Sequence, residues 1–175
     1  AVTKRDGNKE DISLEKITNR ISVLSNGLEI DPITIAQKAI QGLYDGITTN
    51  EIDTYLAETA AALTVEHPDY SYLAGRIKAN ALHKETPGFV IATKNLFEDG
   101  LLRDEYYQKV MANAEEIEKI IDYDRDYLFD YFALTTLFRA YLLQFNSKVI
   151  ERPQDLWMRV ALCVAGDKFD FYQVK

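Results

Sequence analysis

The chain has 175 residues, and its 47% hydrophobic content is enough for a buried core in one domain or two small ones. Twenty lysines and arginines against 28 aspartates and glutamates give a net charge of −8, which argues against broad, non-specific binding to nucleic acid or to an anionic membrane. One cysteine cannot form an internal disulfide or a cysteine-rich zinc site, and no apolar run is long enough to span a bilayer, so we expect a reducing, cytoplasmic setting.

The first eighteen residues predict a short cationic β-hairpin that runs into a helix. Val2 and Ile12 flank Asp6-Gly7, a pair that readily takes the positive φ angles of a tight turn. Four cations fall on the strands and the first helical turn: Lys4, Arg5, Lys9 and Lys16. Together with free backbone N–H groups they indicate a site for a polyphosphate. The alternative is a solvated hairpin whose cations are neutralised by its own acidic residues, Asp6, Glu10, Asp11 and Glu15.

Capping residues mark four helices in the first half of the chain. Ser13 caps a helix that ends near Gly27, and Asp31-Pro32 begins a second helix that runs towards Gly46. Residues 48–51, TTNE, have the form of a capping box for a third helix, which ends near residue 67. The fourth covers residues 69–86 and stops at Pro87-Gly88. Their apolar stripes are predicted to face the core: Leu14, Ile17, Ile21 and Leu24; Ile33, Ala36, Ile40 and Leu43; Ile52, Leu56, Ala60 and Leu63; Leu73, Ile77 and Leu82.

Residues 88–175 stay helical in pattern and carry clustered aromatic side chains. We expect most of these in the core: Tyr106, Tyr107, Tyr123, Tyr127, Phe129, Tyr131 and Phe132. Residues 122–126 form a charged insertion, residues 148–151 are predicted to be extended, and Pro153 begins a last helix. The predicted fold is therefore mainly α, with a short β-hairpin and a four-helix bundle over residues 1–87 and a helical segment over residues 88–175.

Candidates for catalysis are few. Cys163 lies between two aliphatic residues and is predicted to be a small buried hydrophobe. His67 and His83 lie near helix ends, where capping or surface contact is the ordinary role, and neither has the spacing of a metal site. The paired carboxylates at 115–116 and at 122 and 124 are interpreted as solvated helix faces. The residues alone predict no active site.

Several ordered blocks resemble a known family. The first half resembles the ATP cone, the nucleotide-sensing module at the N-terminus of many ribonucleotide reductase large subunits, in KRDG (4–7), QGLYDG (41–46), TTNEID (48–53), AETAA (57–61), HPDY (67–70) and LHKET (82–86). The second half resembles the helical region that leads into the catalytic barrel of the class I enzyme, in YDRD (123–126), RAYLL (139–143), ERPQ (151–154) and MRV (158–160). One departure is ALTTLF at 133–138, where the family has a Lys and a Glu.

The resemblance implies a regulatory segment of a larger enzyme. The complete enzyme would reduce ribonucleoside diphosphates to deoxyribonucleoside diphosphates, with a radical delivered by a small metal-containing subunit. The reducing cysteine pair and the radical cysteine of the family lie in the barrel, and Cys163 matches none of them, so this chain alone is expected to be inactive. It would instead bind ATP or dATP as an allosteric effector, with Mg²⁺, and associate with other large subunits. Neither nucleic acid nor a membrane is an expected partner.

The same resemblance implies the residues of the nucleotide site. The phosphates would lie against Lys4, Arg5, Lys16 and Lys84, and the adenine against Glu10, Asp11, Ile12 and Ser13. Thr49 and Asp53 would lie near the sugar or the phosphates, and Asp53 is the residue expected to distinguish ATP from dATP, since a polar side chain is needed to sense one 2′-hydroxyl.

Two other functions are weighed against this one. A vestigial cone would act only as a helical surface for subunit interaction. A free-standing ATP-cone transcriptional regulator would need a zinc ribbon, whose cysteines are missing here.

Overall fold

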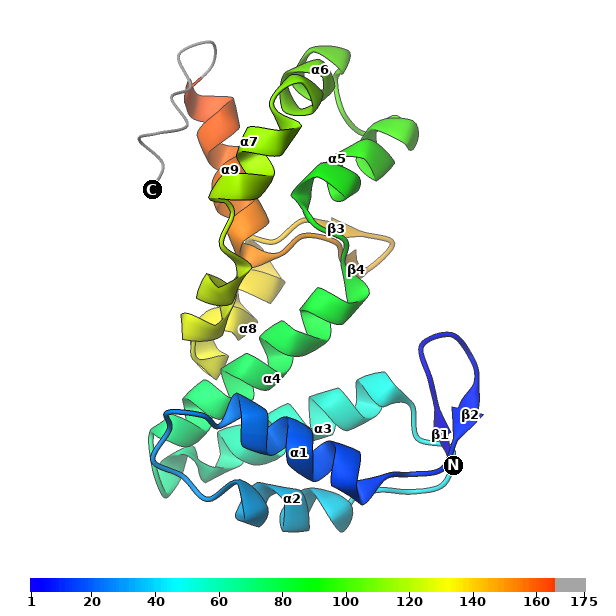
Figure 1. Ribbon diagram of the computed structural model, residues 1–175, viewed down its shortest axis with the longest axis vertical. Coiled ribbons are helices and arrows are strands. Elements are labelled where there is room, and N and C mark those ends of the chain that lie inside the picture. Colours follow the sequence, from blue (N-terminus) through cyan, green and yellow to red (C-terminus); the bar gives the residue numbers. More distant parts are fainter. Residues whose placement is uncertain (166–175) are drawn as a thin grey trace. The chain divides into compact units, whose positions relative to one another are not determined.

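The computed structural model describes residues 1–165 and is mainly helical, as predicted (Figure 1). The chain divides into two compact units. The first comprises residues Ala1–Ala81 and Tyr127–Thr135, and the second comprises Leu82–Asp126 and the residues from Thr136 onward. The domain boundary expected at Pro87-Gly88 stays a prediction. None of the helices over residues 1–165 is long and apolar enough to cross a membrane.

The first unit begins with an antiparallel hairpin of β1 (Val2–Thr3) and β2 (Lys9–Glu10). It continues through α1 (Leu14–Leu24), α2 (Pro32–Ile40), α3 (Thr49–Ala62), a 3₁₀ turn (Leu63–Val65) and most of α4 (Asp69–Glu85). α1 packs against α2 and α2 against α3 (Figure 1). The core of this unit includes Ile21, Ile35, Leu56, Leu73 and Ile77, each at most 1% exposed.

The predicted caps of the first three helices are present. Ser13 Oγ accepts a hydrogen bond from the Lys16 amide at 3.2 Å, and Asp31 Oδ1 accepts one from the Ile33 amide at 3.0 Å. At the start of α3 the Thr48 hydroxyl accepts from the Glu51 amide, and the Glu51 carboxylate accepts from the Thr48 amide at 2.8 Å, which completes the capping box.

The hairpin turn differs in detail from the prediction. Gly7 has a φ of +84°, but Asp6 keeps an ordinary negative φ, since only Asn146 and Ser147 are non-glycine residues with positive φ in the described part of the chain. The Gly7 amide donates to Lys4 O at 3.0 Å, and Asp6 Oδ1 accepts from the Asn8 amide at 3.0 Å. The Asp6 side chain therefore stabilises the loop, and a single left-handed glycine is enough to close it.

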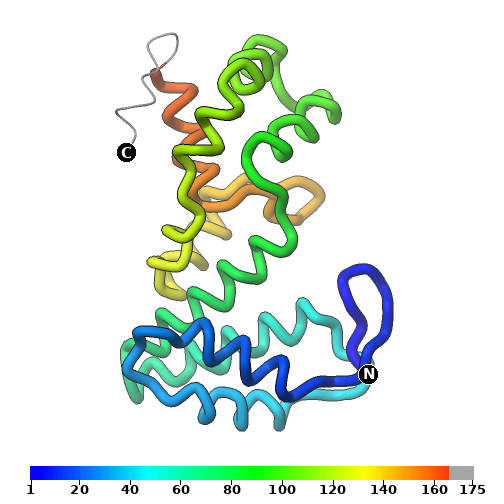
Figure 2. The backbone as a smooth tube through the Cα atoms, in the orientation of Figure 1, coloured from blue at the N-terminus to red at the C-terminus, as the bar shows by residue number. Residues whose placement is uncertain are grey.

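The hairpin is fixed to the N-terminus of α3 by backbone contacts. The Thr3 amide donates to Ile47 O at 3.0 Å, and Thr3 and Thr48 form an isolated parallel bridge. Figure 2 traces the hairpin and the strand-like approach to α3 next to the N-terminus. These contacts bring the first residues of the chain to the first turn of α3.

The second unit contains the end of α4, α5 (Phe89–Glu98), α6 (Asp104–Ala112), α7 (Ala114–Ile120) and α9 (Pro153–Ala165). The 3₁₀ turn Tyr123–Leu128 and α8 (Tyr131–Ala140) each contribute residues to both units. A second hairpin joins β3 (Gln144–Phe145) to β4 (Lys148–Val149) through Asn146 and Ser147. The predicted extended stretch at 148–151 is β4 in part, and the predicted start of the last helix at Pro153 is confirmed.

Four burial predictions were wrong. Leu14, predicted in the inward stripe of α1, is 44% exposed, because it is the first residue of the helix and lies at the edge of the core. On α2 the buried residues are Ile35, Ala36 and Ala39, which form a face of the helix rotated from the predicted one, so Ile33 is 55% exposed and Ile40 is 36% exposed. Phe132 is 77% exposed, and the other clustered aromatic side chains are only partly buried. Cys163 is exposed, because it follows the buried Leu162 on α9 and one helical residue turns the side chain by about 100°.

Candidate functional site

The hairpin and the first turn of α1 bring two predicted site residues together around the carboxylate of a third, Glu10. Lys4 Nζ lies 2.8 Å from Glu10 Oε2, and Lys16 Nζ is paired with Glu10 Oε1. These two ammonium groups, Lys16 first and then Lys4, lower the pKa of Glu10 to about 2. All three side chains are accessible to solvent, so an incoming anion can reach both lysines by replacing Glu10.

A second, deeper group of charges surrounds Asp53 on the first turns of α3. Asp53 is 3% exposed, and its carboxylate accepts from Arg5 Nη2 at 2.7 Å through one oxygen and from Arg20 Nη1 through the other. Burial of this carboxylate depends on the two guanidinium groups, because an unpaired buried charge is strongly destabilising. The structure therefore brings Arg5 and Asp53 together, and it adds Arg20.

Sequence reasoning missed Arg20. Arg20 follows Lys16 by four residues on α1, so the two side chains lie on the same face of the helix. That spacing was the signal that could have added Arg20 to the site. Its Nε donates to Asn80 Oδ1 at 3.0 Å, and its Nη2 is buried without a hydrogen-bond partner in the described structure.

The remaining predicted residues have mainly structural contacts. Thr49 Oγ1 donates to Thr3 O at 3.3 Å and so joins α3 to the hairpin, and Ser13 caps α1. Ile12 is partly buried against the core, whereas Asp11 is exposed. Lys84 is exposed on the last turn of α4 in the second unit, and its place in the nucleotide site stays a prediction.

The site has the charges to hold a phosphate chain but no protein cage for a metal. Two accessible lysines lie on the hairpin and α1, and two partly exposed arginines pair with Asp53. Within residues 1–165 no group of three or more His, Cys, Asp or Glu side chains is placed to hold a metal ion. A Mg²⁺ ion would therefore be held chiefly by phosphate oxygens and water, its usual ligands beside nucleotides.

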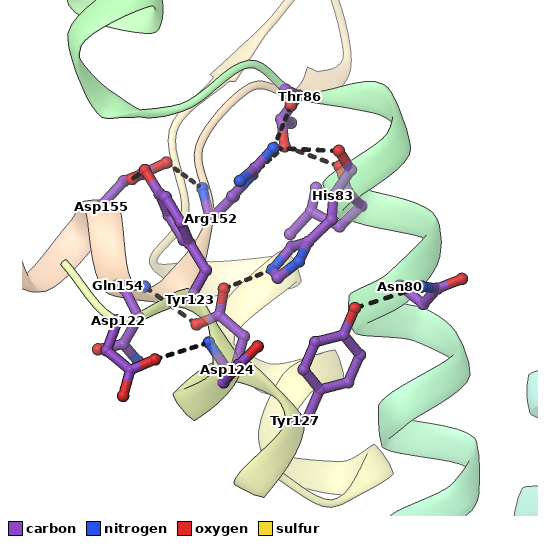
Figure 3. Close-up of polar contacts among 12 residues, drawn as sticks. Asn80, His83, Thr86, Asp122, Tyr123, Asp124, Tyr127, Arg152, Gln154 and Asp155 are labelled. Atoms are coloured by element: carbon purple, nitrogen blue, oxygen red, sulfur yellow. Dashed lines mark hydrogen bonds and ion pairs between the residues drawn. The ribbon is translucent and has the colours of Figure 1, made fainter. Parts of the chain in front are cut away.

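A separate polar cluster lies in the second unit (Figure 3). His83 Nε2 is 2.7 Å from Asp126 Oδ2, so this histidine pairs with a buried carboxylate, whereas a capping or surface role was predicted. Tyr123 donates to Asp155 Oδ1 at 2.6 Å, and the Arg152 amide donates to Asp155 Oδ2 at 3.0 Å. Desolvation by burial raises the pKa of Asp155 to about 6. The Arg152 side chain donates to carbonyls of His83 and Thr86, which caps the C-terminus of α4.

Comparison with known proteins identifies the two regions of the chain. Residues 1–85 match the family model of the ATP cone domain, and residues 127–173 match that of the ribonucleotide reductase all-alpha domain. The chain is 44% identical over 179 residues to the ribonucleoside-diphosphate reductase large subunit of Caenorhabditis elegans, an alignment that covers 95% of this chain and 23% of that protein.

Two further relatives give the same picture. The large subunit of Danio rerio is 44% identical over 174 residues, covering 92% of this chain and 22% of that protein. Large chain 2 of Saccharomyces cerevisiae is 43% identical over 182 residues, an alignment that covers 97% of this chain and 21% of that protein. The chain thus spans about a fifth of the length of the relatives that it matches. By these matches, the chain belongs to the ribonucleotide reductase large-subunit family, of which it carries the ATP cone and part of the all-alpha domain.

Proposed function

We propose that this chain is the adenine-nucleotide-sensing region of a ribonucleoside-diphosphate reductase large subunit. The match of residues 1–85 to the ATP cone carries the proposal. In the complete protein, ATP or dATP bound here would set the rate at which ribonucleoside diphosphates are reduced to deoxyribonucleoside diphosphates. That reduction would depend on a barrel domain and on the radical from a small metal-containing subunit, so the 175-residue chain alone forms no deoxyribonucleotide. Its setting would be the cytoplasm.

The charges at the hairpin fit a triphosphate. Lys4 and Lys16 would exchange Glu10 for phosphate oxygens. This exchange would need little reorganisation of the two lysines, because both ammonium groups already converge on one carboxylate. Glu10, once released, would remain with Asp11, Ile12 and Ser13 beside the adenine. Mg²⁺ bound to the phosphates would reduce their negative charge near these acidic residues.

Asp53 would act on nucleotide preference through the arginines that it holds. Its carboxylate is buried and both oxygens are engaged, so it is suited to position Arg5 and Arg20 for the sugar and phosphates. A change of one 2′-hydroxyl near this group would alter the hydrogen bonds of a charge network whose central carboxylate is shielded from bulk water. Thr49 keeps α3 and the hairpin together beside it.

Calorimetric titration of the 175-residue chain tests the proposal. ATP and dATP, each with Mg²⁺, are expected to bind, whereas CTP of the same charge should bind much more weakly because the base contacts are lost. Lys4→Ala should weaken ATP binding, and Lys38→Ala, on α2 and paired with Glu66 outside the proposed site, serves as the matched control. No heat and no thermal shift at millimolar ATP and dATP would contradict the proposal and favour a vestigial cone that only contacts other subunits.

Regulation in the complete protein would proceed through subunit association. Light scattering of the full-length large subunit with ATP and with dATP measures this directly, and the radical-generating subunit is the second partner to add. We expect the two nucleotides to give different assembly states at equal saturation. Identical assembly with both would contradict the regulatory part of the proposal.

A further inference from the structure

A chain of hydrogen bonds runs from Asp53 to Tyr127 within the first unit. Arg20 bridges Asp53 on α3 and Asn80 on α4, with Nη1 on the Asp53 carboxylate and Nε 3.0 Å from Asn80 Oδ1. Asn80 Nδ2 then donates to the Tyr127 hydroxyl at 3.2 Å (Figure 3). We call the residues Arg20, Asn80 and Tyr127 the polar relay. Asp53 belongs to the proposed nucleotide site, and Tyr127 is the first residue matched by the all-alpha domain model.

One side-chain amide makes both bonds of the relay. Asn80 accepts from Arg20 with its oxygen and donates to Tyr127 with its nitrogen, so the two bonds fix the same orientation of the amide. If Arg20 moves away from Asn80, the amide loses the contact that holds its oxygen and is free to rotate. The bond to Tyr127 is then weakened, although Tyr127 retains its other contacts.

Arg20 is not fully satisfied in this arrangement. Its Nη2 is buried and has no hydrogen-bond partner in the described structure, while its other two nitrogens are engaged by Asp53 and Asn80. An unmet buried donor favours any rearrangement that gives it an acceptor. A nucleotide phosphate or hydroxyl that enters beside Asp53 supplies such an acceptor, and the guanidinium can turn towards it at the expense of Asn80.

The segment at the far end of the relay is held to α4 by two kinds of contact. Near Gly75 the backbones approach so closely that a Cβ atom there would lie 2.3 Å from Phe129 O. Lys78 Nζ lies 5.8 Å from the centre of the Tyr131 ring. These contacts do not involve Arg20, whereas the Asn80–Tyr127 bond connects this segment to the charges around Asp53 through the relay.

We propose that the polar relay couples nucleotide binding to residues 127–135. An anion that engages Arg20 draws its guanidinium from Asn80, and loss of the Asn80–Tyr127 bond loosens the start of the all-alpha region. The inference rests on the proposed function for its ligand. The coupling is reciprocal. If the Asn80–Tyr127 bond weakens nucleotide binding by a given free energy, bound nucleotide weakens that bond by the same free energy.

Hydrogen exchange and calorimetry on the 175-residue chain test the relay. In the wild type, saturating ATP should speed amide exchange in residues 127–135. In Tyr127→Phe, amide exchange in residues 127–135 should already be fast without nucleotide, and ATP should not speed it further. The Kd of this variant for ATP should be about two- to tenfold lower than that of the wild type, the usual range for one hydrogen bond. Asn80→Ala should behave in the same way and replaces Tyr127→Phe if that variant does not fold. Tyr72→Phe, at a 43% exposed position of α4, is the matched control.

The outcomes separate the relay from the proposed function. ATP binding with unchanged exchange in residues 127–135, slower exchange there, or an unchanged Kd in both relay variants would overturn the relay and leave the nucleotide site intact. Absence of any ATP or dATP binding to the wild type would overturn the nucleotide site, and the relay with it.

Discussion

Arg5 Nη2 lies 2.7 Å from Asp53 Oδ2, which joins the N-terminal hairpin to a carboxylate that is 3% exposed on α3. The same carboxylate pairs with Arg20 on α1. One aspartate thus connects three elements that are separate in sequence. The role proposed for it in nucleotide sensing and its role in stability cannot be independent, because both depend on the same two guanidinium groups.

Replacement of Asp53 should therefore affect stability as well as nucleotide preference. Asp53→Asn keeps the shape of the side chain but leaves two guanidinium groups without their anion, and we expect a loss of about 1.5 to 3 kcal/mol in the free energy of unfolding. The ratio of ATP to dATP affinity should also change. Urea unfolding and paired titrations measure the two effects.

Asp45→Asn provides the control for this variant. The Asp45 side chain is 89% exposed and pairs with the N-terminal ammonium group. Exposed ion pairs of this kind contribute at most about 1 kcal/mol to the free energy of unfolding. Equal stability of the two variants, together with an unchanged affinity ratio in Asp53→Asn, would show that Asp53 contributes neither to stability nor to nucleotide preference.

Local signals predicted the first half of the fold well. The caps Ser13, Asp31 and Thr48 each satisfy backbone N–H groups by contacts within three residues, so the sequence alone identifies where their helices begin. Burial on α2 was harder, because the inward face depends on how the helix packs between α1 and α3. The second hairpin was missed because its turn residues, Asn146 and Ser147, lack the glycine that usually marks such turns.

The candidate site was predicted only in part, for a related reason. Lys4, Glu10 and Lys16 are close in sequence, and their convergence follows from the hairpin and the first turn of α1. Arg20 and Asn80 are 60 residues apart, and Asn80 and Tyr127 are 47 residues apart. No periodicity or motif connects such residues, since their contact depends on how α1, α4 and the 3₁₀ turn pack together.

The lysines of the proposed phosphate site should discriminate between phosphate chain lengths. Lys4→Ala and Lys84→Ala are each expected to weaken ATP binding more than AMP binding, because each ammonium group is proposed to face the terminal phosphates. Charge-assisted contacts of this kind contribute about 1.5 to 3 kcal/mol, or roughly ten- to a hundredfold in affinity. Calorimetry with both ligands gives the comparison, and equal losses for ATP and AMP would place these lysines away from the phosphate tail.

Gly75 should be intolerant of a side chain even though it lies within a helix. Alanine normally stabilises a helix relative to glycine by about 1 kcal/mol. In Gly75→Ala, however, the new Cβ would lie 2.3 Å from Phe129 O and 2.8 Å from the Asp130 carbonyl carbon. Backbone atoms cannot move aside as a flexible side chain can, so we expect a net loss of about 1 to 3 kcal/mol in urea unfolding. A gain in stability would mean that residues 129–130 do not approach α4 in solution.

Asp155 should make stability depend on pH in the direction opposite to that of an ordinary ion-paired aspartate. Its pKa is raised from 3.8 to about 6, chiefly by burial, so the folded chain retains a proton that the unfolded chain has lost between these values. The stabilisation from this proton is complete below pH 3.8 and is lost as pH rises through 6. The loss is up to about 3 kcal/mol, from about two pKa units at 1.36 kcal/mol each.

Asp155→Asn removes this titration while keeping an oxygen that can accept from the Tyr123 hydroxyl. Its amide cannot replace the bond from the Arg152 amide, so the variant loses some stability at every pH. The difference in unfolding free energy, wild type minus variant, should therefore be largest near pH 4 and shrink by pH 7. Asp124→Asn, at an exposed position of the same 3₁₀ turn as Tyr123, should show no such change. Parallel stability curves for wild type and Asp155→Asn between pH 4 and 7 would mean that Asp155 titrates normally and that the cluster around Tyr123 is open to water.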